Sequence, residues 1–254
     1  MKPIILKQSC WGKVREHQYD VAILPWGATE PHNLHLPYGT DTLQAEAFAG
    51  KAADIAWDKG AKCMVLPGIP LGVQNPGQVD LPFCLHTSPA TQTAILRDIL
   101  TSLQGQGILK LVVMNSHGGN GFKSIIRELQ PEFQNMFIGV IDWFSVSECY
   151  HFFDDPGDHA GELETSVMMH CFPEFVLPLA EAGNGEAKGF KLEGLKSKLA
   201  WTPRNWSKVS EDTGVGNPMK ATKEKGEKCF DFLSDKIAGF LVELAAVEGD
   251  DIYE

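Results

Sequence analysis

The sequence predicts an α/β fold, a three-layer α/β/α sandwich with a mostly parallel central sheet. Short apolar runs that end in proline or glycine alternate with longer segments whose apolar residues recur at helical spacing. The short runs are continuously apolar, which is typical of parallel strands buried on both faces. The chain has 254 residues and no shift in composition, so we expect a single domain over residues 1–254.

Four apolar runs are the predicted strands, and each is bounded by polar or turn-forming residues. They lie at residues 21–24, 63–66, 111–114 and 137–141. The first two end at Pro-Trp-Gly and Pro-Gly, and the third ends at a run rich in glycine. The strands alternate with predicted helices along the chain. This repeated strand–helix–strand order predicts parallel pairing of the strands, with helices on both faces of the sheet.

The predicted helices are recognised by spacing and by their ends. Asp41 stands at the expected N-cap of the first helix, and Ser88 with Pro89 opens the second, which Gly105 closes. The Pro- and Gly-rich residues 70–87 form a long loop, and loops of that length are usually functional. The helices are expected at residues 41–57, 88–105, 122–130, 161–170 and 222–247, with an irregular stretch at 183–217.

Composition and charge limit the classes of function. The net charge of −11 disfavours nucleic-acid and anionic-membrane partners, because both attract basic patches. No apolar run reaches the roughly 18 residues that a membrane span needs. The six cysteines are scattered without a CxxC pair, so we expect neither a disulfide framework nor a zinc knuckle, and a reducing cytoplasm is the expected location.

A first cluster of ionisable residues follows the first predicted strand: Glu30, His32 and Asp41. Open α/β sheets place their binding crevices at the carboxyl ends of strands, and divalent transition metals bind imidazole and carboxylate. Glu30 and His32 share one ion if this segment stays extended. If a turn at Pro31 splays them, they serve two neighbouring ions with Asp41 as the bridge.

A second cluster follows the third predicted strand in the run NSHGGN, which contains His117. Gly118 and Gly119 permit close approach of the backbone, and the amides that open the next helix could hold an anion or a developing oxyanion. We therefore predict substrate contacts at Gly118, Gly119 and Asn120, and a pocket wall at Trp143.

A third cluster, DHAGELETS, opens the helix expected at 161–170. Glu164 lies about one turn into this helix and can face the crevice, whereas Glu162 points roughly 160–200° away. His159 precedes the helix, in a position to exchange protons with a substrate.

Each cluster also has a purely structural interpretation. Asp41 could be a helix cap, His117 a core histidine bonded to the backbone, and Glu162 and Glu164 an acidic helix start that complements the dipole. Taken singly, these interpretations are at least as good as the functional ones. Three such clusters at the ends of strands and helices together favour a metal site.

The runs GATEPHNLHLPYGTDT, NSHGGN and DHAGELETS resemble the three signature segments of the creatininase (creatinine amidohydrolase) family, and LPFCLHTSPAT and DTGVGNPMKATKEKG are similar to two further segments in the family's order. The resemblance implies a three-layer α/β/α domain that holds two divalent metal ions, usually zinc or manganese and occasionally iron. It also implies a homo-oligomer, a hexamer or a dimer, that hydrolyses C–N bonds in small cyclic or formyl amides.

Carried over by motif position, the resemblance implies that Glu30 and His117 bind one metal, that His32 binds the other, and that Asp41 bridges them. His159 matches the histidine that the family assigns to proton transfer.

One metal ligand of creatininase itself is missing from its usual place. In creatininase this carboxylate lies two residues after the histidine of the NSHGGN segment. The corresponding position here is Gly119, so the ligand must come from elsewhere. Glu164, the fixed glutamate of its motif, is our candidate as a catalytic and metal-binding carboxylate, and Glu162 is the alternative.

Other departures from the family pattern concern the substrate. Pro31 replaces a usual Gln, Asn33 replaces a usual Gly, and residues 83–86 (FCLH) stand where Gly-Thr-Leu-Ser is typical. The loop at 70–87 also lacks the family's Glu-His pair. A pocket altered in these places need not accept creatinine.

The sequence therefore favours a binuclear metal-dependent amidohydrolase that acts on a non-peptide C–N bond. The main alternative is a family member that has lost catalysis and binds metal and a small molecule, and a metallopeptidase-like cleavage is a third. The intact set of Glu30, His32, Asp41, His117 and His159 favours the enzyme.

Overall fold

The computed structural model describes residues 2–248 and 251–253, and in this part of the chain it forms a four-stranded sheet. The strands are β1 (Val21–Trp26), β2 (Cys63–Val65), β3 (Lys110–Asn115) and β4 (Phe137–Asp142). Their order is β2-β1-β3-β4, and every neighbouring pair is parallel. The predicted α/β fold with a mostly parallel sheet is confirmed.

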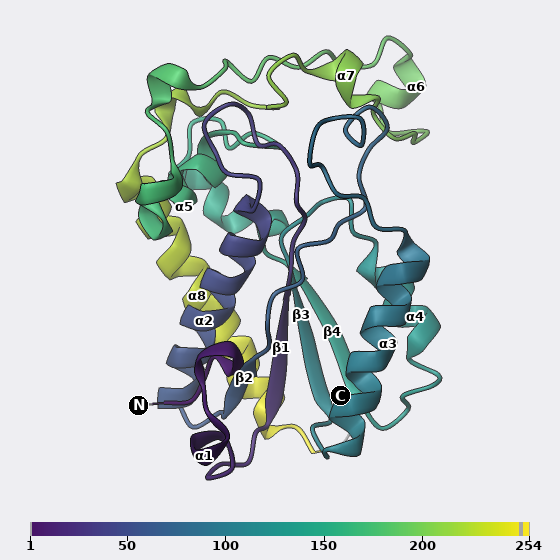
Figure 1. Cartoon of the computed structure of the whole chain (residues 1–254), viewed down its shortest axis with the longest axis vertical. Helices are drawn as coiled ribbons and strands as arrows, with labels where there is room; N and C mark the ends of the chain where they lie inside the picture. The colour runs from purple at the N-terminus through teal and green to yellow at the C-terminus, as the bar shows by residue number, and fades with distance from the viewer. Residues whose placement is uncertain (1, 249–250, 254) are drawn as a thin grey trace.

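Helices cover both faces of the sheet (Figure 1). The long helices α2 (Thr40–Asp58) and α8 (Lys223–Ala246), with α5 (Glu162–Cys171), cover one face, and α3 (Pro89–Gly105) and α4 (Phe122–Leu129) cover the other. The short helices are α1 (Trp11–Val14), α6 (Glu193–Lys196) and α7 (Trp206–Val209), of which α6 and α7 lie at the top of Figure 1. Short 3₁₀ helices lie at Leu6–Gln8, Trp143–Ser145, Ser147–Phe152, Pro173–Phe175, Leu179–Glu181 and Pro218–Lys220.

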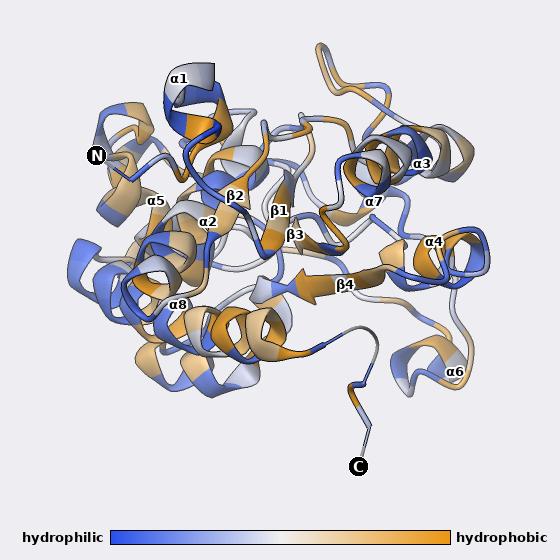
Figure 2. Ribbon diagram, turned by 90° about the horizontal axis from the view of Figure 1, so that it is seen from below, coloured by the Kyte–Doolittle hydropathy of each residue, from blue (hydrophilic) through white to orange (hydrophobic). Residues whose placement is uncertain are grey.

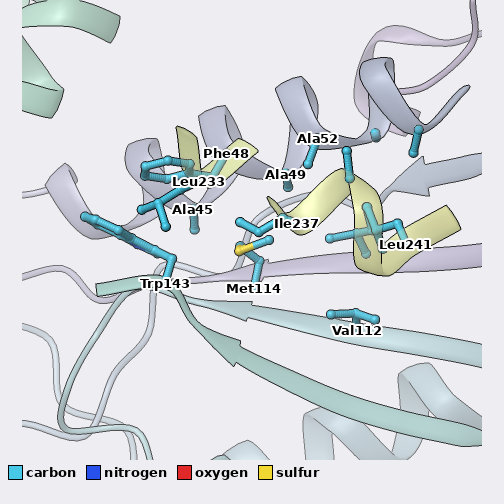
Figure 3. Close-up of a cluster of buried hydrophobic side chains, with 14 of the residues drawn as sticks. Ala45, Phe48, Ala49, Ala52, Val112, Met114, Trp143, Leu233, Ile237 and Leu241 are labelled. Atoms are coloured by element: carbon cyan, nitrogen blue, oxygen red, sulfur yellow. The ribbon is translucent and has the colours of Figure 1, made fainter. Parts of the chain in front are cut away.

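The pleat of the strands divides the core into two apolar clusters. Val21 and Ile23 of β1 pack towards α2 and α8, whereas Ala22 and Leu24 pack towards α3 and α4. Figure 3 shows the first cluster, in which α2 and α8 meet side chains of β3. Figure 2 shows the apolar strands enclosed between helices whose polar residues face outward. No helix in the described part of the chain is both long and apolar enough to cross a bilayer.

Of two predicted helix N-caps, one is confirmed and the other is wrong. Ser88 caps α3 as predicted, because its Oγ accepts a hydrogen bond from the Thr91 N–H at 3.2 Å. The predicted N-cap at Asp41 is wrong, since α2 begins at Thr40 after Gly39, with no side-chain cap. Asp41 lies in the first turn, where its carboxylate faces two histidines instead of the helix amides.

The carboxyl ends of the central strands are level with one another. Trp26 of β1 pairs with Asn115 of β3, which in turn pairs with Asp142 of β4. The segments that leave β1 and β3 therefore meet at one edge of the sheet, where open α/β sheets form their binding crevices.

Candidate metal centre

The turn after β1 brings α2 against the segment that carries Glu30. A Cβ on Gly27 would lie 2.4 Å from the backbone nitrogen of Thr42, so only glycine allows the helix to approach this closely. The approach places Asp41, in the first turn of α2, beside the residues that follow the turn. Glu30, His32 and Asp41 are each at most 1% exposed.

Two histidines and two carboxylates face one another in this buried space. His32 Nε2 lies 2.9 Å from Asp41 Oδ1, and His117 Nδ1 lies 2.9 Å from Glu30 Oε1 and 3.2 Å from Asp41 Oδ2. The prediction that Asp41 and His117 come together, although 76 positions apart in the sequence, agrees with this geometry. In the described part of the chain, Asp41 Oδ2 accepts no well-formed hydrogen bond despite its burial.

Each of three histidines has its second ring nitrogen at a backbone carbonyl. His32 Nδ1 lies 3.0 Å from the Glu30 carbonyl, His117 Nε2 lies 2.9 Å from the Val73 carbonyl, and His159 Nε2 lies 2.8 Å from the Pro31 carbonyl. A carbonyl only accepts, so each of these nitrogens carries the proton. The other nitrogen of each ring then faces carboxylate oxygens, an arrangement that is typical of metal-binding histidines.

The same residues form two groups of candidate ligands that share Asp41. The first cation group is Glu30, Asp41 and His117, and the second cation group is His32, Asp41 and Glu164; within each group the ligand atoms lie within 4.8 Å of one another. Two ligands about 2.1 Å from one ion stand roughly 3.0–3.4 Å apart, which matches the contacts above. An overlapping third group joins Glu30, His32 and His159. The donor set therefore fits two neighbouring cations with Asp41 between them.

The electrostatics of the site also favour a positive charge among these groups. Burial lowers the pKa of His32, but the Asp41 carboxylate, together with Glu164 and Glu30, outweighs this effect and raises that pKa to about 10. The pKa of His117 is likewise raised well above its usual value by Glu30 and Asp41 against the effect of burial. Burial raises the pKa of Asp41, but His32 and His117 outweigh it, and the pKa is lowered. Without a cation, protons take the positions between the rings and the carboxylates.

The two candidate glutamates of α5 have separate environments. Glu164 lies in the second cation group, and its Oε2 accepts from the Ala160 N–H at 2.5 Å. Desolvation raises the pKa of Glu164, and His32 and His159 oppose this effect. Glu162 is buried away from the cation groups, where Lys225 and the N–H groups of Asp154 and Asp155 bind its carboxylate.

Among the glycines of the NSHGGN run, only Gly118 lines the pocket beside the cation groups. A Cβ on Gly119 would lie 2.0 Å from the Val73 carbonyl oxygen and 2.6 Å from His117 Nε2. No side chain fits there without moving the loop, which explains why this position holds no carboxylate.

Two predicted substrate contacts instead have structural roles. Asn120 donates to the Gly27 carbonyl and to Asn115, and its oxygen accepts from Val73 N–H and Gln92, so its hydrogen-bonding capacity is used internally. Trp143 is fully buried against Phe48 in the core shown in Figure 3, and its Nε1 donates to Ser116 Oγ at 2.6 Å. An aromatic residue at the end of a strand packs in the core here because α2 and α8 cover that face.

Much of the pocket wall comes from the segment between β4 and α5, where the sequence singled out His159 but not the aromatic residues that precede it. Phe144 and Tyr150 of this segment line the pocket, together with Leu163 of α5 and residues of the cation groups. Behind His159, the Trp206 ring packs edge-on at 5.3 Å between centroids. These residues carry no recognisable signal because isolated aromatic side chains in irregular segments usually indicate packing.

Three positions that depart from the family pattern have defined surroundings in the structure. Asn33 has a φ of 54°, which favours glycine or asparagine, and its side chain bonds the backbone of Gly183. Pro31 supplies the carbonyl that orients His159. Burial, with a contribution from Glu30, raises the pKa of Cys84 to about 12, so its thiol stays protonated at neutral pH.

Comparisons with known proteins agree with this geometry. The sequence profile of the creatininase family, described as creatinine amidohydrolase, matches residues 7–241. The mycofactocin precursor peptide peptidase of Mycobacterium ulcerans is 29% identical over 223 residues, which cover 82% of this chain and 79% of that protein. The creatinine amidohydrolase of Pseudomonas putida is 29% identical over 182 residues, which cover 61% of this chain and 66% of that protein.

Solved structures share the fold. A candidate creatinine amidohydrolase from Bacteroides fragilis superposes with a TM-score of 0.95 at 52% identity and full coverage of both chains. A manganese creatininase superposes with a TM-score of 0.77 at 22% identity, covering 97% of this chain and all of that one. A mutant creatininase of Zn–Zn type has a TM-score of 0.75, also at 22% identity, with the same coverage.

Proposed function

The chain belongs to the creatininase family, and on this premise we propose that it is a binuclear metal-dependent hydrolase that cleaves a C–N bond of a small amide. The observation that carries the proposal is the pair of cation groups that share the buried carboxylate of Asp41. We propose that Glu30 and His117 hold one divalent cation, that His32 and Glu164 hold the other, and that Asp41 bridges them.

Zinc and manganese are the proposed metals, and iron is a further candidate. Solved creatininases occur in manganese and Zn–Zn forms, and the mixed imidazole and carboxylate donors of this site suit all three ions. When bound, a pair of such cations supplies Lewis acidity and a nucleophile at neutral pH.

The proposed task of His159 is proton transfer. Its Nε2 is held by the Pro31 carbonyl, so Nδ1 is left free, 3.8 Å from Glu30 Oε1 and on the wall of the pocket. Nδ1 can take a proton from the nucleophile and give it to the leaving nitrogen. Trp206 and the Pro31 carbonyl keep the ring in this orientation, which lowers the entropic cost of the transfer.

Peptide cleavage is a second candidate function, and one comparison favours it. The match to the mycofactocin precursor peptide peptidase covers 79% of that protein, against 66% of the creatinine amidohydrolase. A family member that has lost catalysis and keeps its cations for small-molecule binding is the remaining alternative, although the free Nδ1 of His159 argues against it.

The test is a turnover panel with Zn²⁺- or Mn²⁺-loaded protein. The panel contains creatinine, other cyclic amides, N-formyl compounds and short peptides, each assayed with wild type, His159→Ala and the control His151→Ala, which changes an exposed histidine outside the cation groups. We expect His159→Ala to keep its metal and lose about 10²–10⁴-fold in turnover, while the control stays unchanged. Full activity of His159→Ala would remove His159 from the mechanism, and no turnover of any compound would favour the binding role.

We also propose that the protein is a homo-oligomer. The segment around α6 exposes large apolar side chains, with Leu192 at 69%, Leu199 at 87% and Trp201 at 85% exposed. Light scattering on the purified protein should give a mass of two or more times 27.9 kDa, and a monomer at all concentrations would refute the proposal.

A further inference from the structure

Gln78 lies buried in the long loop between β2 and α3, with a side-chain amide whose orientation is fixed from both ends. Its Nε2 donates to Glu30 Oε2, and its Oε1 accepts from the Asn75 N–H at 3.4 Å. A carboxylate oxygen accepts and a backbone N–H donates, so the amide cannot be turned round. Gln78 is 1% exposed, so water does not compete for these bonds.

This contact divides the two oxygens of Glu30 between two tasks. Oε2 is bound by Gln78, whereas Oε1 lies 2.9 Å from His117 Nδ1 and faces the first cation group. Gln78 therefore holds Glu30 in an orientation that presents a single oxygen to a cation. Without the amide donor, Glu30 could rotate and offer both oxygens, which would change the number of ligand atoms.

The same loop also orients the histidine of the first cation group. The Val73 carbonyl accepts from His117 Nε2 at 2.9 Å, and the Val73 N–H is held by Asn120 Oδ1 at 3.2 Å. Residues 73–78 thus contact both Glu30 and His117. The second cation group has other supports, because the Glu30 carbonyl orients His32 and the Ala160 N–H binds Glu164.

We infer that Gln78 is a positioning residue that sets the affinity and the coordination of one cation only, the one in the first cation group, by orienting Glu30. This inference rests on the proposed function, since it presupposes that the groups bind cations. It also assigns a role to the loop at 70–87, which lacks the family's Glu-His pair, as a support for one half of the centre.

The test compares Gln78→Leu and Gln78→Glu with wild type and with the control Gln74→Leu. Gln74 lies in the same loop and is 7% exposed, but its side-chain amide donates to the Leu85 carbonyl and not to a member of either cation group. Zn²⁺ affinities are measured by competition with a chelator, and coordination is followed by the visible absorption of the Co²⁺-loaded proteins. Thermal melting of the metal-free proteins checks that each variant folds. If Gln78→Leu does not fold, the comparison of Zn²⁺ affinities rests on the isosteric Gln78→Glu.

We expect each Gln78 variant to bind one Zn²⁺ about 10–100-fold more weakly than wild type, as is usual when a partner of a metal ligand is lost. The other Zn²⁺ should keep its affinity within about threefold, the Co²⁺ spectrum should change, and Gln74→Leu should match wild type. Two cations of wild-type affinity in the Gln78 variants, or equal weakening of both, would overturn the inference and leave the proposed function intact. A wild-type protein that binds no Zn²⁺ would overturn both.

Discussion

Gly119→Ala is the substitution whose effect on the centre can be worked out most directly from the structure. The added Cβ would lie 2.0 Å from the Val73 carbonyl oxygen, whereas ordinary contact begins at 3.4 Å, so the loop or the glycine must move by about 1.4 Å. That carbonyl orients His117 through a bond of 2.9 Å, which a displacement of this size breaks. We expect a loss of about 1–3 kcal/mol in the free energy of unfolding and about 10–100-fold weaker metal binding.

The neighbouring glycine provides a matched control for this prediction. Gly118 is exposed, and a Cβ there would meet nothing within 4 Å, so Gly118→Ala should match wild type in both measurements. The assays are chemical denaturation of the metal-free proteins and chelator competition for Zn²⁺. If Gly119→Ala were as stable as Gly118→Ala and bound Zn²⁺ as tightly, the contact between the Val73 carbonyl and His117 would not support the centre.

Three further predictions concern metal removal, protons and a buried ion pair. Chelation should lower the melting temperature, because a cation bound only by the folded state stabilises it, and an unchanged melting curve after exhaustive dialysis against chelator would argue against bound metal. With their raised pKa values, His32 and His117 are each protonated on both ring nitrogens in the metal-free protein at pH 7. Metal binding must displace the proton on the ligand nitrogen of each ring, so calorimetry in buffers of different ionisation enthalpy should show about two protons released per chain, and the metal affinity should fall as the pH falls. Release of no protons would contradict this protonation. Lys225→Met should lower the free energy of unfolding by about 3 kcal/mol or more, because it leaves the buried Glu162 carboxylate without its cation. The control Lys236→Met breaks an exposed ion pair and should cost less than about 1 kcal/mol. Similar losses for the two variants in denaturation experiments would refute the distinction.

The layers and strand positions could be predicted because their signals are local. Continuous apolar runs mark β1 to β4 within one or two residues, and the Ser88-Pro89 start of α3 follows from capping chemistry. In α8, Phe240 is 36% exposed, although Ile237 and Leu241 on the same apolar stripe are buried. Helical spacing gives the direction of an apolar face but not its width, which depends on how far the neighbouring helices reach.

The candidate ligands could be predicted because they follow strands whose ends the parallel sheet brings level. Their supports could not, because these are backbone carbonyls and a loop amide whose partners depend on tertiary contacts. The Pro31 and Val73 carbonyls that orient His159 and His117 have no sequence signal, and neither does the bond from Gln78 to Glu30. The choice between Glu162 and Glu164 required Lys225, which lies 63 residues from Glu162 and binds it.

The central claim is that one buried carboxylate joins two cation positions, and the number of Zn²⁺ ions bound by Asp41→Asn tests it most directly. Zn²⁺ per chain is measured by elemental analysis after equilibrium dialysis over a range of free Zn²⁺ concentrations, beside wild type. We predict two ions per chain in wild type, and a parallel loss of both in Asp41→Asn. One ion retained at wild-type affinity in Asp41→Asn, or a single ion in wild type, would contradict the shared carboxylate.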